Sequence, residues 1–563
     1  MFQKFDSSTL YRLIPWASGL LCLLVLLYSM DVLSRSIGFS WDELWDYIPS
    51  VGLIQGDSLA GIQEIEVLGH YVPLVSGPYQ GALKTWVVTP VISLFGTTPR
   101  SIRTLNVLFG MTYLLALYWA LLPVVGKKWA WVVFMSPLLD TNFLLFAPMD
   151  YGPSLFQFIF ISLALGALFR YLVNFELKYY RLVWFFIGCL LAQKLTAIPI
   201  AIGIIVITMA FTIRFLWKSA GQIRWPSVIK CYGIIPSLLL LVPMVPHLLY
   251  FYLSGFTHLF SMTADGVREP YFAALLGNIL NFYPMFDGTG WYQRITLEVL
   301  DRPPPVLFVS GLATMLASVA ICLTLGCRKN LDMPAIASTG LFFLAFLLFP
   351  AFGGLNRPWH FFILTPLFAG GFIISIAVLL TCFENRWKNF AVWFQGGIVV
   401  CLISGAGISA THGFGILQEI ESRKGVCITS PVITDVYENL RVANIRKIFG
   451  ITYSIAYPIY VLSKGSIRVD ELAWTDLTEE KIDEMLNMVK ENSEVAIVYR
   501  SCGHKEESAK WIGWLNHEPQ IFELIKRVDS EIPKLDIQII SDERAADFVL
   551  IKKHTVDPPP AHQ

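Results

Sequence analysis

Three acidic residues stand within five positions of one another, directly after the first long apolar segment. They are Asp42, Glu43 and Asp46, and they are interleaved with Trp41 and Trp45. On a helix, Asp42 and Asp46 would share a face. Paired carboxylates beside aromatic rings can raise one pKa and so provide a general base. The alternative is a solvated amphipathic turn at a membrane interface, and the spacing leaves both open.

Two further acids adjoin apolar segments. Asp150 lies in a short connection that covers residues 146–153, and Asp140 lies within or just outside the apolar segment before it. An acid beside hydrocarbon is costly and is a functional candidate by default. The alternatives are a helix-start acid at the positive end of the next segment for Asp150, and a buried structural acid or a cavity lining for Asp140.

Four cations interrupt apolar surroundings: Lys84, Lys194, Arg357 and His360. Lysine binds phosphate as a point charge, and arginine binds it with two parallel hydrogen bonds. Lys84 and Arg357 are therefore candidates for holding a phosphate near the outer leaflet. Each cation alone could equally extend to lipid headgroups. Several of them near outer carboxylates favour a binding site.

The composition shows what kind of chain must position these residues. Of 563 residues, 55% are hydrophobic and 15% are charged, and the mean hydropathy is +0.58. Soluble domains carry about 25% charged residues, so a disordered, collagenous or typical cytosolic chain is excluded. Nine cysteines are too few for a disulfide-built scaffold. A polytopic α-helical membrane protein remains, and its zero net charge gives no indication of a nucleic-acid partner.

About eleven segments are apolar and long enough to be membrane spans. They cover residues 13–30, 102–124, 129–146, 153–170, 182–196, 197–213, 231–252, 305–325, 334–352, 359–381 and 389–409. The two segments that meet near Lys194 and Pro199 are short, and they could form a broken hairpin or a re-entrant element. The apolar stretch from Leu83 to Phe95 is too short to span and is expected to be an interfacial helix.

Basic residues predict the orientation of these segments. If the N-terminus is cytoplasmic, the cytoplasmic connections hold 15 basic and four acidic residues, as the positive-inside rule requires. Eleven spans then place the C-terminus outside. The same orientation predicts two long outer loops, at residues 31–101 and 254–304. The first apolar run is expected to stay as an anchor, because no small-residue cleavage site follows it.

Charge also divides the chain into two parts. Of 84 charged residues, 42 lie in residues 411–563 and 42 in residues 1–410. We therefore expect a membrane domain over residues 1–410 and a soluble, extracytoplasmic α/β domain over residues 411–563. Its expected strands are residues 496–500, 537–540 and 548–552, and residues 478–491 are expected to form a helix. Cys427 and Cys502 could form a disulfide or stay as buried thiols.

The order of four motifs resembles a known family. These are Asp42-Glu43, then residues 79–84 (YQGALK) with Arg103 before the next span, then residues 150–153 (DYGP), and finally residues 357–360 (RPWH). Over residues 10–410 the chain resembles the GT-C membrane glycosyltransferases, in particular the glycosyltransferase 39 group of protein O-mannosyltransferases and lipid A aminoarabinose transferases. Relatives often carry Lys-Pro-Pro or His-Pro-Pro where this chain has Lys84-Thr85-Trp86.

The resemblance implies an enzyme of the cell envelope, in the bacterial inner membrane, that moves a hexose or pentose from a polyprenyl-phosphate carrier to an acceptor hydroxyl on a lipid, glycan or protein. It implies Asp42, Glu43 and Asp150 as catalytic residues. It also implies Lys84, with Arg357 and His360, as the groups that bind the donor phosphate. No nucleotide loop, HExxH or CxxC is present. The sequence thus predicts no cofactor, and a divalent metal stays open.

Two other functions fit the composition. A transporter or flippase of lipid-linked sugars would use acids and cations in a midplane cavity, but it would be expected to contain internal repeats, and the second half shows no repeat of the first. A non-catalytic sensor or scaffold would use the outer domain and would leave the carboxylates and lysines unexplained.

Overall fold

The structure is a computed structural model of residues 1–563. It describes residues 7–58, 64–77, 79–150, 152, 154–218, 225–254, 275, 290, 292, 295, 306–325, 329–351, 363–423, 430–451, 455–472, 478–501, 535–540 and 547–553. Arg357, His360, Cys427, Cys502 and nearly all of the expected outer loop 254–304 lie outside these residues.

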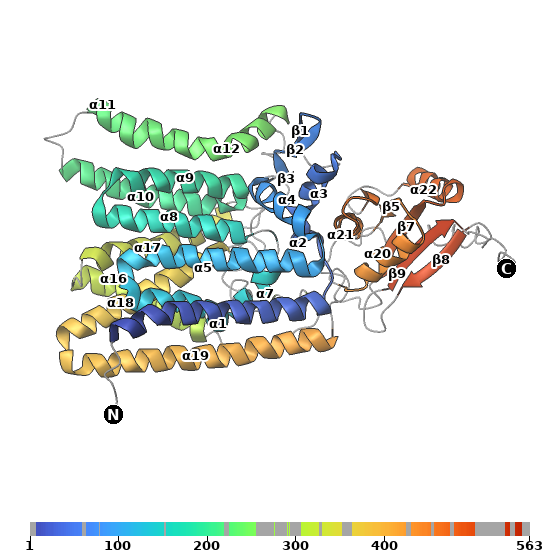
Figure 1. Cartoon of the computed structure of the whole chain (residues 1–563). Coiled ribbons are helices and arrows are strands. Elements are labelled where there is room, and N and C mark those ends of the chain that lie inside the picture. Colours follow the sequence, from blue (N-terminus) through green and yellow to red (C-terminus); the bar gives the residue numbers. More distant parts are fainter. Residues whose placement is uncertain are drawn as a thin grey trace.

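Long helices make up most of the chain and lie side by side in a bundle (Figure 1). They are α1 (Ser7–Ser36), α5 (Pro99–Ala130), α8 (Leu155–Asn174), α9 (Leu177–Gln193), α10 (Ile198–Lys218), α12 (Ile235–Leu253), α16 (Val306–Thr324), α17 (Lys329–Leu348), α18 (Thr365–Arg386) and α19 (Lys388–Arg423). Short α11 (Trp225–Val228) and the π-helical turn η4 (Ile229–Ile234) precede α12, and the 3-10 turn η5 (Phe349–Ala351) follows α17.

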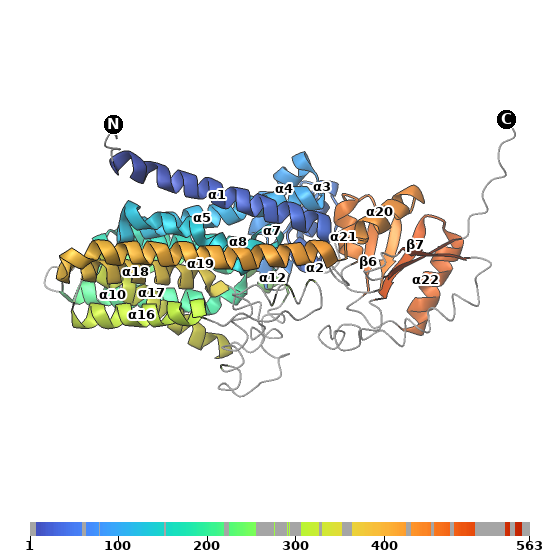
Figure 2. The same ribbon diagram turned by 90° about the horizontal axis from the view of Figure 1, so that it is seen from below.

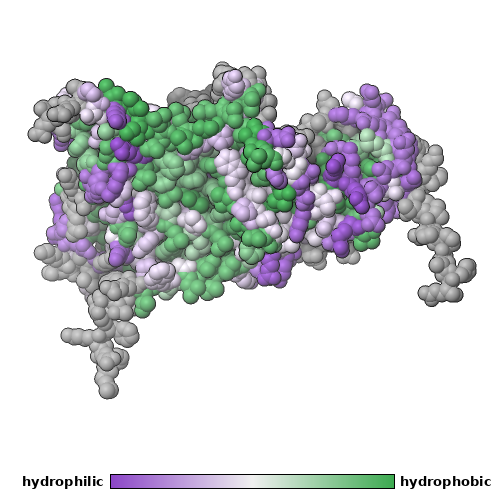
Figure 3. Space-filling view, turned by 45° about the horizontal axis from the view of Figure 1, so that its top comes forward, coloured by the Kyte–Doolittle hydropathy of each residue, from purple (hydrophilic) through white to green (hydrophobic). Residues whose placement is uncertain are grey.

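Eight helices of the described residues are long and apolar enough to cross a membrane. The protein is therefore an integral membrane protein. Figure 3 shows the apolar residues spread over the bundle, with hydrophilic residues gathered toward its ends and over the C-terminal part. Ten of the eleven expected spans coincide with one of the ten long helices. Within the described residues, α9 and the described part of α16 fall below the length or hydropathy of a full span, although both pack in the bundle.

The expected span at residues 129–146 is not a single helix. The chain forms the 3-10 helix η1 (Trp131–Met135), then α6 (Ser136–Leu139) and α7 (Thr141–Met149), and these pack along α1 and α5. The break comes at Asp140, whose extended backbone begins α7 and whose Oδ1 accepts a hydrogen bond from the Phe143 amide at 3.2 Å. An N-cap residue has non-helical backbone angles, so α6 ends at Leu139 and a new helix begins after Asp140. Asp140 is thus a buried structural acid.

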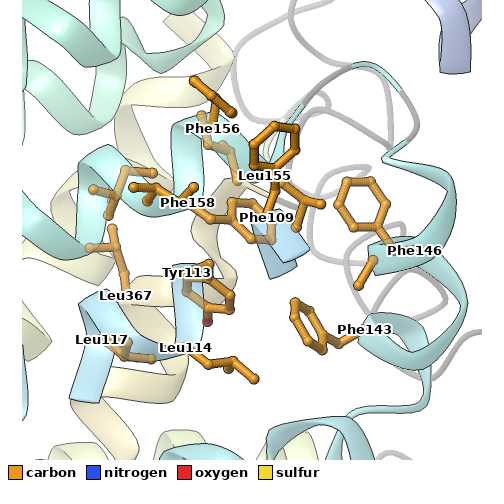
Figure 4. Close-up of a cluster of buried hydrophobic side chains, with 14 of the residues drawn as sticks. Phe109, Tyr113, Leu114, Leu117, Phe143, Phe146, Leu155, Phe156, Phe158 and Leu367 are labelled. Carbon is orange, nitrogen blue, oxygen red and sulfur yellow. The ribbon is translucent and has the colours of Figure 1, made fainter. Parts of the chain in front are cut away.

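An aromatic cluster fills the bundle between α5, α7 and α8 (Figure 4). The rings of Phe109 and Phe156 meet edge to face at 4.9 Å between centroids, and Tyr113 lies 5.2 Å from Phe158. Such packing is rigid, because interiors of this density leave side chains few alternative positions. Phe109 of this cluster lies 5.8 Å from the ammonium of Lys84, so the cluster borders the buried charges described below.

Short elements gather between α1 and α5. Helices α2 (Trp41–Leu44) and α3 (Tyr47–Gln55) are followed by two hairpins and α4 (Leu83–Phe95), the expected 13-residue helix. The strands are β1 (Glu64–Val67) with β2 (His70–Pro73), and β3 (Val75–Gly77) with β4 (Gln80–Gly81), each pair antiparallel. In Figure 1 these elements lie at the end of the bundle nearest the C-terminal sheet.

The C-terminal part contains a five-stranded sheet of order β6-β5-β7-β9-β8. Strands β5 (Lys447–Gly450), β6 (Arg468–Glu471) and β7 (Val495–Ser501) are parallel, whereas β8 (Leu535–Ile540) and β9 (Asp547–Lys553) add antiparallel pairs. The helices are α20 (Ile433–Val442), α21 (Ala456–Leu462) and α22 (Glu479–Glu491). The three expected strands and the expected helix, N-capped by Thr478, are confirmed. The expected boundary at residue 410 falls inside α19, which continues to Arg423.

Candidate functional site

Lys84 is the centre of a buried charge cluster. It lies in the first turn of α4 and its side chain is fully buried. Its Nζ is 2.6 Å from Oδ2 of Asp150 and 3.8 Å from Oδ2 of Asp46. The rings of Tyr47 and Phe109 lie 5.0 and 5.8 Å from the same ammonium. Because a buried charge requires a partner, the two carboxylates and the lysine stabilise one another.

Asp150 has two structural tasks at once. It ends α7 in the left-handed region, at φ +44°. Its Oδ1 accepts a hydrogen bond from the Leu155 amide at 2.8 Å, at the start of α8, while Oδ2 binds Lys84. The helix-start hypothesis for Asp150 is confirmed, and the same carboxylate also belongs to the buried charge cluster around Lys84. These bonds fix the carboxylate, so it holds Lys84 in place.

Asp46 begins α3, after a turn that separates it from α2, so Asp42 and Asp46 do not share one helix. Its carboxylate accepts hydrogen bonds from Gln80 Nε2 at 3.4 Å and from Thr85 Oγ1 at 3.3 Å. Burial raises the pKa of Asp46 to about 6, against the lowering effect of Lys84. The carboxyl is thus close to protonation at mildly acidic pH.

Glu43 is held by Arg103 of α5. Arg103 Nε and Nη2 donate to the two carboxylate oxygens at 2.7 and 2.9 Å, and both side chains are buried. The remaining guanidinium N–H groups donate to the carbonyls of Leu33, Ile37 and Gly38 at 2.8–3.0 Å. All five donors are used. Burial raises the pKa of Glu43, and Arg103 opposes this shift. The pair joins α1, α2 and α5.

Asp42 differs from its two acidic neighbours because it is partly exposed, whereas Glu43 and Asp46 are buried. The indole Nε1 of Trp45 donates to its Oδ1 at 3.1 Å. Its carbonyl accepts from the Gly152 amide at 2.9 Å, which ties α2 to the connection after Asp150. Of the three neighbouring acids, Asp42 is therefore the most exposed.

Lys194 is a second buried cation, at the junction of α9 and the 3-10 turn η2 (Leu195–Ala197). Its Nζ donates to the Gly152 carbonyl at 2.6 Å and lies 5.6 Å from the ring of Tyr79. Within the described part of the chain, no carboxylate lies within ion-pair distance of it. Burial lowers the pKa of Lys194 to about 8, against the raising effects of Asp42 and Asp150. The sequence analysis named Lys194 as a candidate, but it did not predict that Lys194 would lie near Lys84 and Asp150.

Sequence reasoning missed two glutamines of the site. Gln80 donates to Asp46, and Gln193 Oε1 accepts a hydrogen bond from the Lys84 amide at 3.1 Å. The missing Cβ of Gly81 would lie 1.8 Å from the Ala192 carbonyl, so β4 runs against the end of α9. Gln193 could have been found from the sequence, because it is a polar residue at the end of an apolar helix. Among the described residues, no group of three or more His, Cys, Asp or Glu could hold a metal ion.

Comparison with known proteins decides the fold. No family model matches the sequence, and no curated protein sequence matches it. A crystal structure of ArnT from Cupriavidus metallidurans in the apo state superposes with a TM-score of 0.52 at 12% identity, over 97% of this chain and 98% of that one. The chain has the GT-C fold. The Archaeoglobus fulgidus oligosaccharyltransferase gives a TM-score of 0.45 at 13% identity, over 84% of this chain and 68% of that one. The superposition with ArnT confirms, at the level of fold, the GT-C resemblance inferred from the motifs.

Proposed function

We propose that this GT-C-fold protein is a membrane glycosyltransferase that moves a hexose or pentose from a polyprenyl-phosphate carrier to a hydroxyl of a lipid, glycan or protein. The main support is one observation. Lys84, Lys194, Asp150 and the partly exposed Asp42 meet at one end of the helix bundle. A transporter would be expected to bind its cargo near the midplane, so this location favours transfer chemistry over the flippase alternative.

Asp42 is proposed as the general base. Its carboxylate takes the proton of the acceptor hydroxyl, and the resulting oxygen attacks the anomeric carbon of the donor. The bond between that carbon and the phosphate oxygen breaks, and polyprenyl phosphate leaves with the electron pair. Glu43 is less suited to this role, because both of its oxygens are bound by Arg103.

Lys194 and Lys84 are proposed to neutralise the leaving phosphate. Lys84 already has Asp150 at 2.6 Å and Asp46 at 3.8 Å. Lys194 has a carbonyl and an aromatic ring, so its charge is the one that an anion would compensate best. Arg357 and His360 remain proposed partners for this phosphate. We also propose that the N-terminus is cytoplasmic, that the site and the C-terminal domain face outward, and that the membrane is the bacterial inner membrane.

The test uses the full-length protein in nanodiscs with polyprenyl-phosphate sugars that carry a labelled pentose or hexose. The proposal predicts release of polyprenyl phosphate and transfer of label to an acceptor, and it predicts that both are lost in Asp42→Asn. Proteoliposomes provide the contrast. Label that crosses the bilayer still attached to its lipid, equally in the parent and in Asp42→Asn, would instead establish a flippase.

A further inference from the structure

The segment that carries the acidic residues is too short to hold its own position. Helix α2 has four residues and α3 has nine, and isolated helices shorter than about 12 residues are marginal. The neighbours of this segment must therefore fix it. On one side, Arg103 of α5 binds Glu43 and the carbonyls at the end of α1. The other side is covered by the C-terminal part of the chain.

Helix α21 makes that second contact. It packs against both α2 and α3, and Figures 1 and 2 show it at the face of the C-terminal part that meets the bundle. Tyr460 is 2% exposed and Val461 is fully buried. Both belong to the same apolar core as Leu44, Tyr47 and Val51, and not to the two cores of the sheet. The membrane domain thus has side chains of the C-terminal domain in its own core.

Two glycines show how closely the parts approach. Gly465, just after α21, has φ +78°, and its missing Cβ would lie 2.7 Å from Gln55 Cγ and 3.3 Å from Val51 Cγ1. The missing Cβ of Gly38, in the link between α1 and α2, would lie 2.2 Å from the Ser430 carbonyl. A side chain at either position would displace one part from the other. The contact therefore has a defined geometry at both ends of the α2–α3 segment.

We propose that α21 is a positioning element for the reaction: Tyr460 and Val461 hold α2 and α3 so that Asp42 and Asp46 keep their places beside Lys194 and Lys84. These two residues do not touch the reacting atoms. The proposal rests on the proposed glycosyl transfer for its kinetic consequence, but the contact itself is independent of it. A displacement of about 1 Å in a catalytic group can reduce a rate by about 100-fold.

Three variants of the full-length protein in nanodiscs test the proposal. Tyr460→Ala removes the ring, and Tyr460→Phe keeps it. Leu486→Ala is the matched control, because Leu486 is 2% exposed but lies in the core on the opposite face of the sheet. The measurements are amide hydrogen exchange of peptides covering residues 41–55, and kcat and donor KM.

Tyr460→Ala is expected to speed exchange in residues 41–55 and to lower kcat by about 10- to 100-fold, with donor KM changed by less than about twofold, since Lys84 and Lys194 lie on other elements. Tyr460→Phe and Leu486→Ala are expected to match the parent in both measurements. Unchanged exchange in Tyr460→Ala, or equal acceleration in Leu486→Ala, would overturn the proposed contact. Faster exchange with a normal kcat would overturn the positioning role. If the parent itself transfers no sugar, the proposed function fails while the exchange data still decide the contact.

Discussion

Asp42→Asn and Glu43→Gln are adjacent, nearly isosteric substitutions that are expected to fail in opposite ways. The first removes a partly exposed carboxylate that we propose as the base. The second removes the charge of a buried carboxylate whose oxygens both bind Arg103. We expect Asp42→Asn to lose activity and keep stability, and Glu43→Gln to lose stability.

The magnitudes follow from the two environments. Loss of a general base reduces a rate by about 10²–10⁴-fold, which corresponds to about 3–5 kcal/mol in the activation barrier. In Asp42→Asn the Trp45 indole can still donate to the amide oxygen of the new side chain, so the stability change should be well below that of Glu43→Gln. Removing one charge of a buried ion pair costs about 3–5 kcal/mol, because Arg103 is then left fully buried with neutral acceptors only.

The assay compares both variants with the parent in the same detergent or nanodisc. Thermal unfolding gives the stability change, and release of polyprenyl phosphate from a labelled donor gives kcat. Glu43→Gln is measured well below its unfolding temperature, so that a rate loss reports chemistry and not unfolded protein. Arg103→Lys serves as a control, since it keeps the charge but loses the two parallel hydrogen bonds.

Two results would refute this reasoning. Near-normal transfer by Asp42→Asn would move the base to Glu43, Asp46 or Asp150. A fully stable Glu43→Gln protein that is catalytically dead would show that Glu43 acts in the chemistry and that its pairing with Arg103 is not its main task.

Three further predictions concern the lysines, pH and topology. Lys194→Gln is expected to raise donor KM by about 10- to 100-fold, which corresponds to the free energy of one charge-assisted hydrogen bond. Lys84→Arg should retain more donor affinity than Lys84→Ala. Unchanged donor KM and kcat in all three variants would show that both lysines have structural roles only. Burial raises the pKa of Asp46 from an ordinary 3.8 to about 6, so the stability that the protonated carboxyl contributes is lost as pH rises between these values. The unfolding temperature of the parent should therefore fall relative to that of Asp46→Asn from pH 4 to 6, and the difference between the two should be constant above about pH 7. A difference that does not depend on pH would contradict the raised pKa. A C-terminal tag should be cleaved by protease added to intact cells, and a tag that stays protected until the membrane is opened would reverse the proposed topology.

The class of the protein and most of its helices and strands could be predicted from the amino-acid sequence. In a membrane, long apolar runs must form helices to satisfy their backbone polar groups. Hydropathy along the chain therefore located ten of the long helices, and among the described residues eight helices are long and apolar enough to span. Alternating β-branched residues and a Thr478 cap likewise located β7, β9 and α22. These features depend on neighbours within about one helix or strand length, which a single sequence contains.

Which charged side chains lie close together depends on the tertiary structure. Lys84, Asp150 and Lys194 are separated by 66 and 44 positions, and no local pattern states that they share a buried centre. The third apolar run was predicted as one span because hydropathy does not record that Asp140 caps a new helix. Glu43 and Asp42 are adjacent and chemically alike. Arg103, 60 residues away in the sequence, binds Glu43 and buries it, whereas Asp42 accepts a hydrogen bond from Trp45 and stays partly exposed.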